Sequence, residues 1–395
     1  MQSSDRNAEH VVSTYQQQLA VPFSYPVHFA KDVFAATNPL LADTLDRLGE
    51  RRRHRAAVYV DSGVAEAHPR LIAQIQEYFH DRPDKIELAA SPTIIPGGRA
   101  AKTGWNHVRE IMWTLGNLHL DRQSFVIAIG GGGVLDMVGF GTSIVHRGLR
   151  LVRLPSTVLA QNDAGVGVKN GMDEHGMKNF VGTFAPPFAV INDFTFLPTL
   201  RPLDWLGGVA EAFKVAIIKD RDFFDFLCAH AVEIRNRDLP VMEHVVRRAA
   251  ELHLQHIAAG GDPFEFGSAR PLDFGHWAGH KLESMSNFAM GHGEAVAYGI
   301  AMDTVYAARL GMLTAQVCER VIAALAACGL GVSTPLSAQR DAAGELTVLG
   351  GLEDFREHLG GVLTVTLPAG LGSRQDVHHM NPDTVAAAIE YLRTR

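Results

Sequence analysis

The sequence predicts an α/β domain with a mostly parallel sheet over residues 1–200, followed by a mainly helical, all-α domain over residues 201–395. A chain of 395 residues is long enough to bury two hydrophobic cores. In the first half, short β-branched runs alternate with helical stretches, which is typical of a parallel sheet. Beyond residue 202 the apolar residues recur with helical period and strand candidates nearly vanish. We place the boundary near Leu200, in the turn-like segment 198–202.

The elements follow in order from these patterns. Residues 57–61 predict a buried strand, and residues 70–79 have the apolar spacing of an amphipathic helix. The other elements expected before the boundary are strands at 85–88, 124–129 and 151–154 and helices at 101–118 and 136–145. Residues 154–169 and 175–179 are expected to be ordered loops. After the boundary we expect helices at 205–218, 221–236, 241–258, 275–285, 294–310 and 315–327, with one strand at 363–367.

Composition narrows the class of protein. Hydrophobic residues make up 47% and charged residues 20%, and the net charge of −7 argues against general nucleic-acid binding. The three cysteines form no CxxC pair, and an odd number argues against a disulfide framework. We find no apolar leader and no run of about 18 apolar residues. The expectation is therefore a cytoplasmic protein that does not enter a membrane.

A glycine run follows the strand expected at residues 124–129. Strand, glycine turn and helix together form the arrangement that holds a pyrophosphate on backbone amides. The run at 130–133 lacks the ordinary G-x-G-x-x-G spacing, and by itself it fits tight packing equally well. Asp61 ends the first strand, where it could accept hydrogen bonds from a ribose or simply cap a helix.

Three later segments combine a carboxylate with imidazoles. Glu211 and Lys214 are spaced i, i+3 in an apolar helix, where a plain surface ion pair is poorly placed. His276 and His280 are spaced i, i+4, and His292 lies between two glycines. One carboxylate with two or three imidazoles suits a catalytic zinc or a similar ion with an open coordination position. Core histidines bonded to carbonyl groups are the alternative.

Other polar side chains are harder to assign from the residues alone. Lys169, Lys178 and Lys214 would form a phosphate-sized positive field if their segments converge. We treat the remaining histidines, among them His253 and His256, as structural or surface residues.

The motifs as an ordered set resemble the sugar phosphate cyclase superfamily, typified by 3-dehydroquinate synthase. They run from about residue 102 to 298 and include GGGxxxD at 130–136, PSTxLAQxD at 155–163, GVGVK at 165–169, KNxxG at 178–182, ExxK at 211–214, GHxxGH at 275–280 and HGEA at 292–295. Related iron-dependent alcohol and glycerol dehydrogenases share the glycine run but use a D-x-x-x-H ligand motif. Here Val215 follows Glu211 at i+4, which favours the cyclase branch.

The resemblance implies a Rossmann-like nucleotide-binding domain, a helical metal-binding domain and a role for each matching residue. Zn²⁺ or Co²⁺ would be bound by Glu211, His276 and His292. NAD⁺ would be surrounded by Asp61, Lys102, Gly131, Gly132, Asp136, Thr157, Lys178 and Thr199. The substrate phosphate and hydroxyls would be held by Lys169, Asn179, Lys214 and His280, with Asp163 near the nicotinamide. Arg147 matches an arginine that reaches the neighbouring subunit's site, which implies a homodimer.

The implied activity is phosphate-eliminating carbocycle formation on a small sugar phosphate, but the chain departs from 3-dehydroquinate synthase where that enzyme binds a carboxylate. Asp273 replaces an asparagine, no lysine occurs in residues 251–256, and the arginine position falls near Ala269, beside Arg270. An aspartate there would repel a carboxylate by about 1 kcal/mol or more. We therefore expect a sugar phosphate that lacks the carboxylate.

The branch and the competing activities stay open at this point. Sedoheptulose 7-phosphate cyclases share the aspartate but lose the second histidine, whereas this chain keeps His280. The chain could therefore also belong to another cyclase branch, such as that of ebo-type gene clusters. Arg99 stands where the family has a ribose-binding glutamate, which weakens the choice of NAD⁺ over NADP⁺. The alternatives are 3-dehydroquinate synthase itself, with Arg270 in place of the missing base, a net NAD-dependent polyol dehydrogenase and a catalytically silent binding protein.

Overall fold

The computed structural model describes residues 13–175, 177–259, 264 and 270–395. The first half of the chain forms a seven-stranded sheet in the order β1-β9-β6-β5-β2-β3, with β4 also paired to β2, and every pairing is parallel. Its strands are β1 (Val27–Ala30), β2 (His54–Asp61), β3 (Ile86–Leu88), β4 (Thr93–Ile95), β5 (Phe125–Gly130), β6 (Arg150–Pro155) and β9 (Ala189–Asp193).

Helices cover both faces of this sheet, which explains why β5 is buried along its whole length. One face packs on α1 (Leu40–Leu45) and α3 (Leu71–His80). The other packs on α5 (Asn106–Asn117) and α6 (Gly132–Ile144). Along β2 the side chains alternate between the two cores, as the pleat requires. The short helices α2 (Ser62–Ala67) and α4 (Arg99–Lys102) lie near the ends of the strands.

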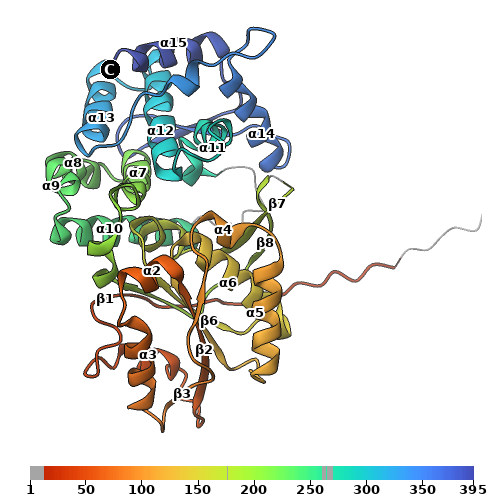
Figure 1. The fold of residues 1–395 in the computed structure, drawn as a ribbon. Coiled ribbons are helices and arrows are strands. Elements are labelled where there is room, and N and C mark those ends of the chain that lie inside the picture. Colours follow the sequence, from red (N-terminus) through yellow and green to blue (C-terminus); the bar gives the residue numbers. More distant parts are fainter. Residues whose placement is uncertain (1–12, 176, 260–263, 265–269) are drawn as a thin grey trace, which may run out of the picture.

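The second half is helical and has its own core. Its helices are α7 (Pro202–Lys219), α8 (Arg221–Ala229), α9 (Ala231–Arg235), α10 (Leu239–Ala259), α11 (His276–Met285), α12 (His292–Arg309), α13 (Ala315–Ala327), α14 (Gly350–His358) and α15 (Pro382–Arg393). Figure 1 shows α11–α15 grouped at one end of the molecule and the parallel sheet at the other. The strand expected at 363–367 is β10 (Val365–Pro368), and it pairs antiparallel with β11 (Arg374–Val377). The fold class expected from the sequence is confirmed.

Several expected elements were wrong in detail. The helix at 101–118 is two helices, because Gly104 adopts a φ of 78° between α4 and α5. The helix at 221–236 is divided into α8 and α9. The segments expected to be loops contain a π-helical turn, Ala160–Ala164, and an antiparallel hairpin of β7 (Lys169–Glu174) and β8 (Met177–Phe184). Within the part of the chain that the structure describes, no helix is long and apolar enough to cross a membrane.

The change from sheet to helices is abrupt. The last strand of the sheet, β9, is followed by a 3-10 turn over Phe194–Thr199, and α7 begins at Pro202, where proline suits the first turn of a helix. Residue 200 remains our proposed domain boundary.

Candidate active site

The segments predicted to bind metal converge from three helices. Glu211 lies in the middle of α7 and is 1% exposed, whereas His276 and His292 are the first residues of α11 and α12. The Nε2 atoms of the two histidines lie 3.5 and 3.4 Å from Glu211 Oε1. Two ligands that are each about 2.1 Å from a tetrahedral zinc ion are about 3.4 Å apart. The three side chains therefore have the spacing of a zinc site with its fourth position open.

Each histidine is held by its other ring nitrogen. His276 Nδ1 lies 3.1 Å from the carbonyl oxygen of Phe274, and His292 Nδ1 lies 3.2 Å from Glu283 Oε2. Such partners fix the tautomer and the orientation of metal-binding imidazoles. Burial alone would lower the pKa of His292, but Glu211 and Glu283 raise it to about 9. Neither oxygen of Glu211 has a hydrogen bond of good geometry, although Oε2 is ion-paired with Lys214, so the carboxylate keeps free lone pairs for a metal ion.

His280 lies on the same side of α11 as His276, with the two ring centroids 5.3 Å apart. Its ring also lies 5.8 Å from that of His292. Burial, and then the neighbouring charges of His276 and His292, lower the pKa of His280 well below its ordinary value. His280 is therefore a neutral imidazole at the edge of the metal-binding cluster.

A buried charge network continues from Glu211 into the α/β half. Lys214 is 2% exposed, pairs with Glu211 on its own helix and lies 3.5 Å from Asp163 in the π-helical turn. Burial would lower the pKa of Lys214, but the two carboxylates raise it above its ordinary value. The charge of Lys214 in turn holds the pKa of Asp163 low, against the effect of burial. All three groups are therefore charged at neutral pH.

His253 on α10, which we expected to be a structural or surface histidine, completes this network. Its Nδ1 lies 2.8 Å from Asp163 Oδ1, so its remaining ring nitrogen is Nε2. His253 falls in the segment 251–256, where the family has a lysine. The contact was invisible in the sequence, because Asp163 and His253 are 90 residues apart.

Asp303 on α12 holds the start of α11 in place through hydrogen bonds. It is fully buried and accepts hydrogen bonds from the backbone amide of Gly275 at 3.1 Å and from Trp277 Nε1 at 2.9 Å. These two residues flank the candidate ligand His276. Gly275 also adopts a φ of 79° and packs against Gly299 and Ile300, so a side chain would not fit there.

We expect Asp303 to make stability depend on pH. Burial raises its pKa from 3.8 to about 7, so between these values the folded protein holds a proton that the unfolded chain has released. Stability should then fall as pH rises from 4 to 7, by at most about 4 kcal/mol. Replacing Asp303 with asparagine should flatten this decline in urea unfolding between pH 4 and 7. The exposed substitution Asp84→Asn is the control, and an unchanged slope in D303N would contradict the assignment.

The predicted nucleotide site lies where the strand order reverses. From β2 the chain continues to β3 on one side of the sheet, whereas from β5 it continues to β6 on the other side. In open α/β sheets, ligands bind at the carboxyl ends of two such neighbouring strands. Asp61 ends β2, Gly130 ends β5, and Gly131 is the N-cap of α6. The first-turn amides of a helix have no partner within the helix and can face an anion.

Close packing explains the glycines of this turn. A Cβ on Gly133 would lie 2.6 Å from the carbonyl oxygen of Gly98, and a Cβ on Gly131 would lie 3.3 Å from Thr157. Asp61 accepts a hydrogen bond from the Gly63 amide at 2.8 Å, so it does cap α2, as its alternative interpretation held. A bound ribose would have to share this carboxylate.

Lysines join the predicted nucleotide and substrate groups. Lys102 Nζ lies 2.7 Å from Asp136 Oδ2 and also donates to the side-chain oxygen of Asn179. Lys178, expected near the nucleotide, pairs with Glu283 and so supports the metal-binding cluster. The β7–β8 hairpin thus connects the glycine turn on one side with α11 on the other.

Of the remaining predicted residues, Thr157 lies against the glycine turn and Arg147 lies far from it. Thr157 accepts a hydrogen bond from the Ala160 amide, and Thr199 lies 2.9 Å from His68 beside α2. Lys169 is the first residue of β7. Arg147 is exposed in the turn after α6, about 20 Å from the glycine turn at the other end of that helix. The structure therefore does not bring Arg147 to the site of its own chain.

One supporting residue, Glu283, was missed from the sequence but left a signal. Glu283 follows His276 at i+7 and His280 at i+3, so its position on the metal-binding face of α11 could have been deduced. Arg99, at the position of the family's ribose-binding glutamate, stacks over the ring of Phe288 with 3.3 Å to the centroid. Ala269, at the family's arginine position, lies outside the described residues.

Comparison with known proteins agrees with this geometry. Family models for the N-terminal and C-terminal parts of 3-dehydroquinate synthase match residues 92–206 and 208–347. A 2-epi-valiolone synthase of Actinosynnema mirum is 33% identical over 375 residues, which cover 93% of this chain and 92% of the relative. The chain belongs to the 3-dehydroquinate synthase-like family of sugar phosphate cyclases. It is thus related to lyase-type enzymes, as expected.

Two further members of this sugar phosphate cyclase family are similar over most of their length. A 3-dehydroquinate synthase of Cereibacter sphaeroides is 31% identical over 346 residues, covering 86% of this chain and 89% of the relative. The solved structure of ValA, a 2-epi-5-epi-valiolone synthase of Streptomyces hygroscopicus subsp. jinggangensis 5008, has NAD⁺ and Zn²⁺ bound. It matches with 27% identity and a TM-score of 0.84 and covers 96% of this chain and 99% of its own.

Proposed function

We propose that this cyclase uses NAD⁺ and a divalent metal ion, Zn²⁺ or Co²⁺, to convert a sugar phosphate without a carboxylate into a carbocycle with release of inorganic phosphate. The observation that carries the choice of substrate is the charge around Lys214. Asp163, Glu211 and Asp273 all raise its pKa, so three carboxylates share this lysine. Because Lys214 is already shared by these carboxylates, Coulomb repulsion disfavours a further carboxylate beside it.

The residues present fit both cofactors. Glu211, His276 and His292 would hold the metal, because their ligand atoms all lie within 4.8 Å of one another and both oxygens of the glutamate lack good hydrogen bonds. The glycine turn at the start of α6 would hold the pyrophosphate of NAD⁺. When bound, NAD⁺ supplies reversible hydride transfer and the metal ion polarises a substrate oxygen.

The side chains of this site have protonation states suited to such a reaction. Lys214 stays protonated and Asp163 stays ionised, so each can hold a hydroxyl group by a charge-assisted hydrogen bond. His280 stays neutral and can relay the proton of a hydroxyl that is oxidised, because a weakly basic imidazole does not retain it. Lys169 and Asn179 on the hairpin would bind the phosphate. The phosphate leaves with the electrons of its C–O bond while the neighbouring C–H bond breaks, its electrons forming a C=C bond and its proton passing to the departing phosphate. The hydride returns to the substrate, so turnover consumes no NAD⁺.

His253 would contact the end of the sugar where the family's acid-binding enzyme has a lysine. Its imidazole is fixed by Asp163 and offers one hydrogen bond rather than a full point charge. The name of the Actinosynnema mirum relative gives a valiolone, a hydroxylated ketone, as its product, whereas dehydroquinate is an acid. Both points support a neutral sugar phosphate such as sedoheptulose 7-phosphate.

We also propose a cytoplasmic homodimer. Arg147 lies exposed at the far end of α6, so it can serve a site only in another chain. Near it, Ile144, Phe180 and Phe184 are exposed apolar side chains on α6 and on the hairpin. Ser143 and Thr183 join these two elements through a hydroxyl contact of 2.8 Å. Such a face is suited to cover by a second subunit.

Release of inorganic phosphate tests the proposal. The protein loaded with NAD⁺ and Zn²⁺ or Co²⁺ should release phosphate from sedoheptulose 7-phosphate without accumulating NADH. It should release at least about tenfold less from 3-deoxy-arabino-heptulosonate 7-phosphate, since one charge-assisted contact is worth roughly 1.5–3 kcal/mol. Strong turnover of the acid would show that the protein is a 3-dehydroquinate synthase. Steady accumulation of NADH would instead identify a polyol dehydrogenase.

A further inference from the structure

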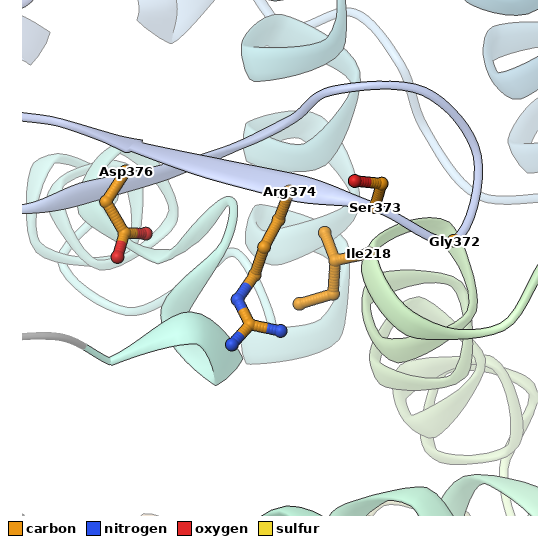
Figure 2. Close-up of a pocket in the computed structure, with 5 residues that line it drawn as sticks. All are labelled: Ile218, Gly372, Ser373, Arg374 and Asp376. Carbon is orange, nitrogen blue, oxygen red and sulfur yellow. The ribbon is translucent and has the colours of Figure 1, made fainter.

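An open cleft lies between the C-terminal end of α7 and the β10–β11 hairpin, and no predicted site residue lines it. Its volume is about 400 Å³, and it is lined by Ile218, Gly372, Ser373, Arg374 and Asp376. Figure 2 shows the guanidinium of Arg374 extending from its strand into open space, with Asp376 directed to a separate place along the same strand. The turn before β11 is fixed by a hydrogen bond from the Gly372 amide to the carbonyl oxygen of Ile217 at 2.8 Å.

Two more basic groups stand beside this cleft. Lys219, the last residue of α7, lies with its Nζ 3.2 Å from His256 Nδ1 on α10. Burial lowers the pKa of Lys219, and the charge of Arg374 lowers it further. Burial, followed by the charges of Lys219 and Arg374, lowers the pKa of His256 to about 4. His256 is therefore neutral and accepts a hydrogen bond from the lysine, while two full positive charges remain.

Within the described part of the chain, these two charges have no counter-ion. Among the residues that the structure describes, neither Lys219 nor Arg374 has a carboxylate within ion-pair distance. Nearby acids are engaged elsewhere, because Asp220 pairs with Arg248 and Asp376 accepts a hydrogen bond from Thr366. Like charges that are partly removed from water repel one another, and a bound anion relieves that repulsion.

We propose that this cleft is a second anion site, which binds a phosphate-sized oxyanion through Arg374 and Lys219. The planar guanidinium offers two parallel donors to such a group. Helix α10 links the cleft with the candidate active site, because His253 lies one turn before His256 and contacts Asp163. The charges of His253 and Lys214 also lower the pKa of His256, so the two sites adjoin.

The second anion site is distinct from the phosphate position of the proposed reaction. That position involves Lys169 and Asn179 on the β7–β8 hairpin, whereas the cleft belongs to α7 and β11. The cleft is therefore suited to inorganic phosphate itself, the released product, or to an anionic group on a substrate that enters the site. Both ligands present a phosphate-sized anionic group, so inorganic phosphate is a suitable probe for either.

Calorimetric titration with inorganic phosphate tests the site in the protein loaded with NAD⁺ and Zn²⁺. Wild type should bind two phosphate ions per chain, and Lys219→Ser with Arg374→Ser should weaken one of them at least about tenfold, because each lost charged donor is worth a factor of that order. The matched control is Arg51→Ser with Arg122→Ser, which removes the same charge from exposed positions. Thermal unfolding checks that every variant is folded.

A Lys169→Met variant separates this inference from the proposed function. It should lose the other phosphate and keep the one in the cleft. If phosphate binding in K219S/R374S equals that of wild type, or falls equally in the control pair, the cleft is not an anion site. If K169M keeps both phosphate ions while K219S/R374S loses one, the cleft site stands and the assignment of Lys169 is wrong.

Discussion

Replacement of Glu211 with glutamine is expected to remove metal binding and to lower kcat at least about 10³-fold. Glutamine keeps the shape of the side chain but not its charge, and the charge is what joins His276 and His292 to the cation. Loss of a metal ion that stabilises developing charge costs several kcal/mol, and each 1.36 kcal/mol is a tenfold change in rate. Elemental analysis after gel filtration should show about one zinc per chain in wild type and less than about a tenth in E211Q.

The fold should survive this substitution, because Lys214 keeps Asp163 as a partner. Circular dichroism and thermal unfolding therefore separate loss of metal from loss of structure. Glu357 is exposed on α14, so Glu357→Gln is a control with the same change of charge and should behave as wild type. Zinc retained at one ion per chain in E211Q would place the metal elsewhere, with His280, Glu283 and His292 as the next candidate group.

The metal-binding cluster could be predicted from sequence because its chemistry is carried by residue types that are costly to bury alone. A carboxylate and a lysine inside the apolar face of α7 need partners, and the histidines of α11 and α12 are spaced to supply them. The glycine turn was ambiguous for the opposite reason. A glycine indicates only that a side chain would not fit at its position. In the structure, Gly98 and Thr157 occupy the volume that such a side chain would need.

The β7–β8 hairpin and His253 could not be predicted in the same way. Strand β8 alternates between exposed and half-buried residues, which is typical of a strand. It also contains glycine, asparagine and lysine, which are uncommon in strands, so its composition suggested a loop. His253 sits in a helix of mixed polarity, where only a partner distant in sequence distinguishes it from a surface histidine. Long-range pairing of this kind requires the fold, because Asp163 is presented by a π-helical turn, a feature often found at functional sites.

Replacement of Lys214 with methionine is expected to destabilise the protein by about 3–5 kcal/mol at pH 7, in addition to abolishing activity. Lys214 is 2% exposed and lies between Glu211 and Asp163, so its removal leaves a buried and a half-buried carboxylate without their main counter-charge. Removing one partner of a buried ion pair typically costs this much, because the other charge remains desolvated. Urea unfolding of both proteins in the presence of a chelator measures the difference without compensation from metal.

The pH dependence of this loss identifies its cause. In wild type the pKa values of Asp163 and Glu211 are lowered, so their contribution to stability is present at neutral pH and is lost only in acid, below the ordinary pKa of about 4. Without the lysine, burial raises both pKa values, and the carboxyls of the folded variant take up protons as pH falls from 7 towards 4. The stability gap between K214M and wild type should therefore narrow over that range.

Adding Asp163→Asn to K214M should restore part of the stability at pH 7, because it removes one of the unpaired charges. A gap that stays constant with pH and is not reduced by the second substitution would mean that Lys214 acts through packing rather than through charge.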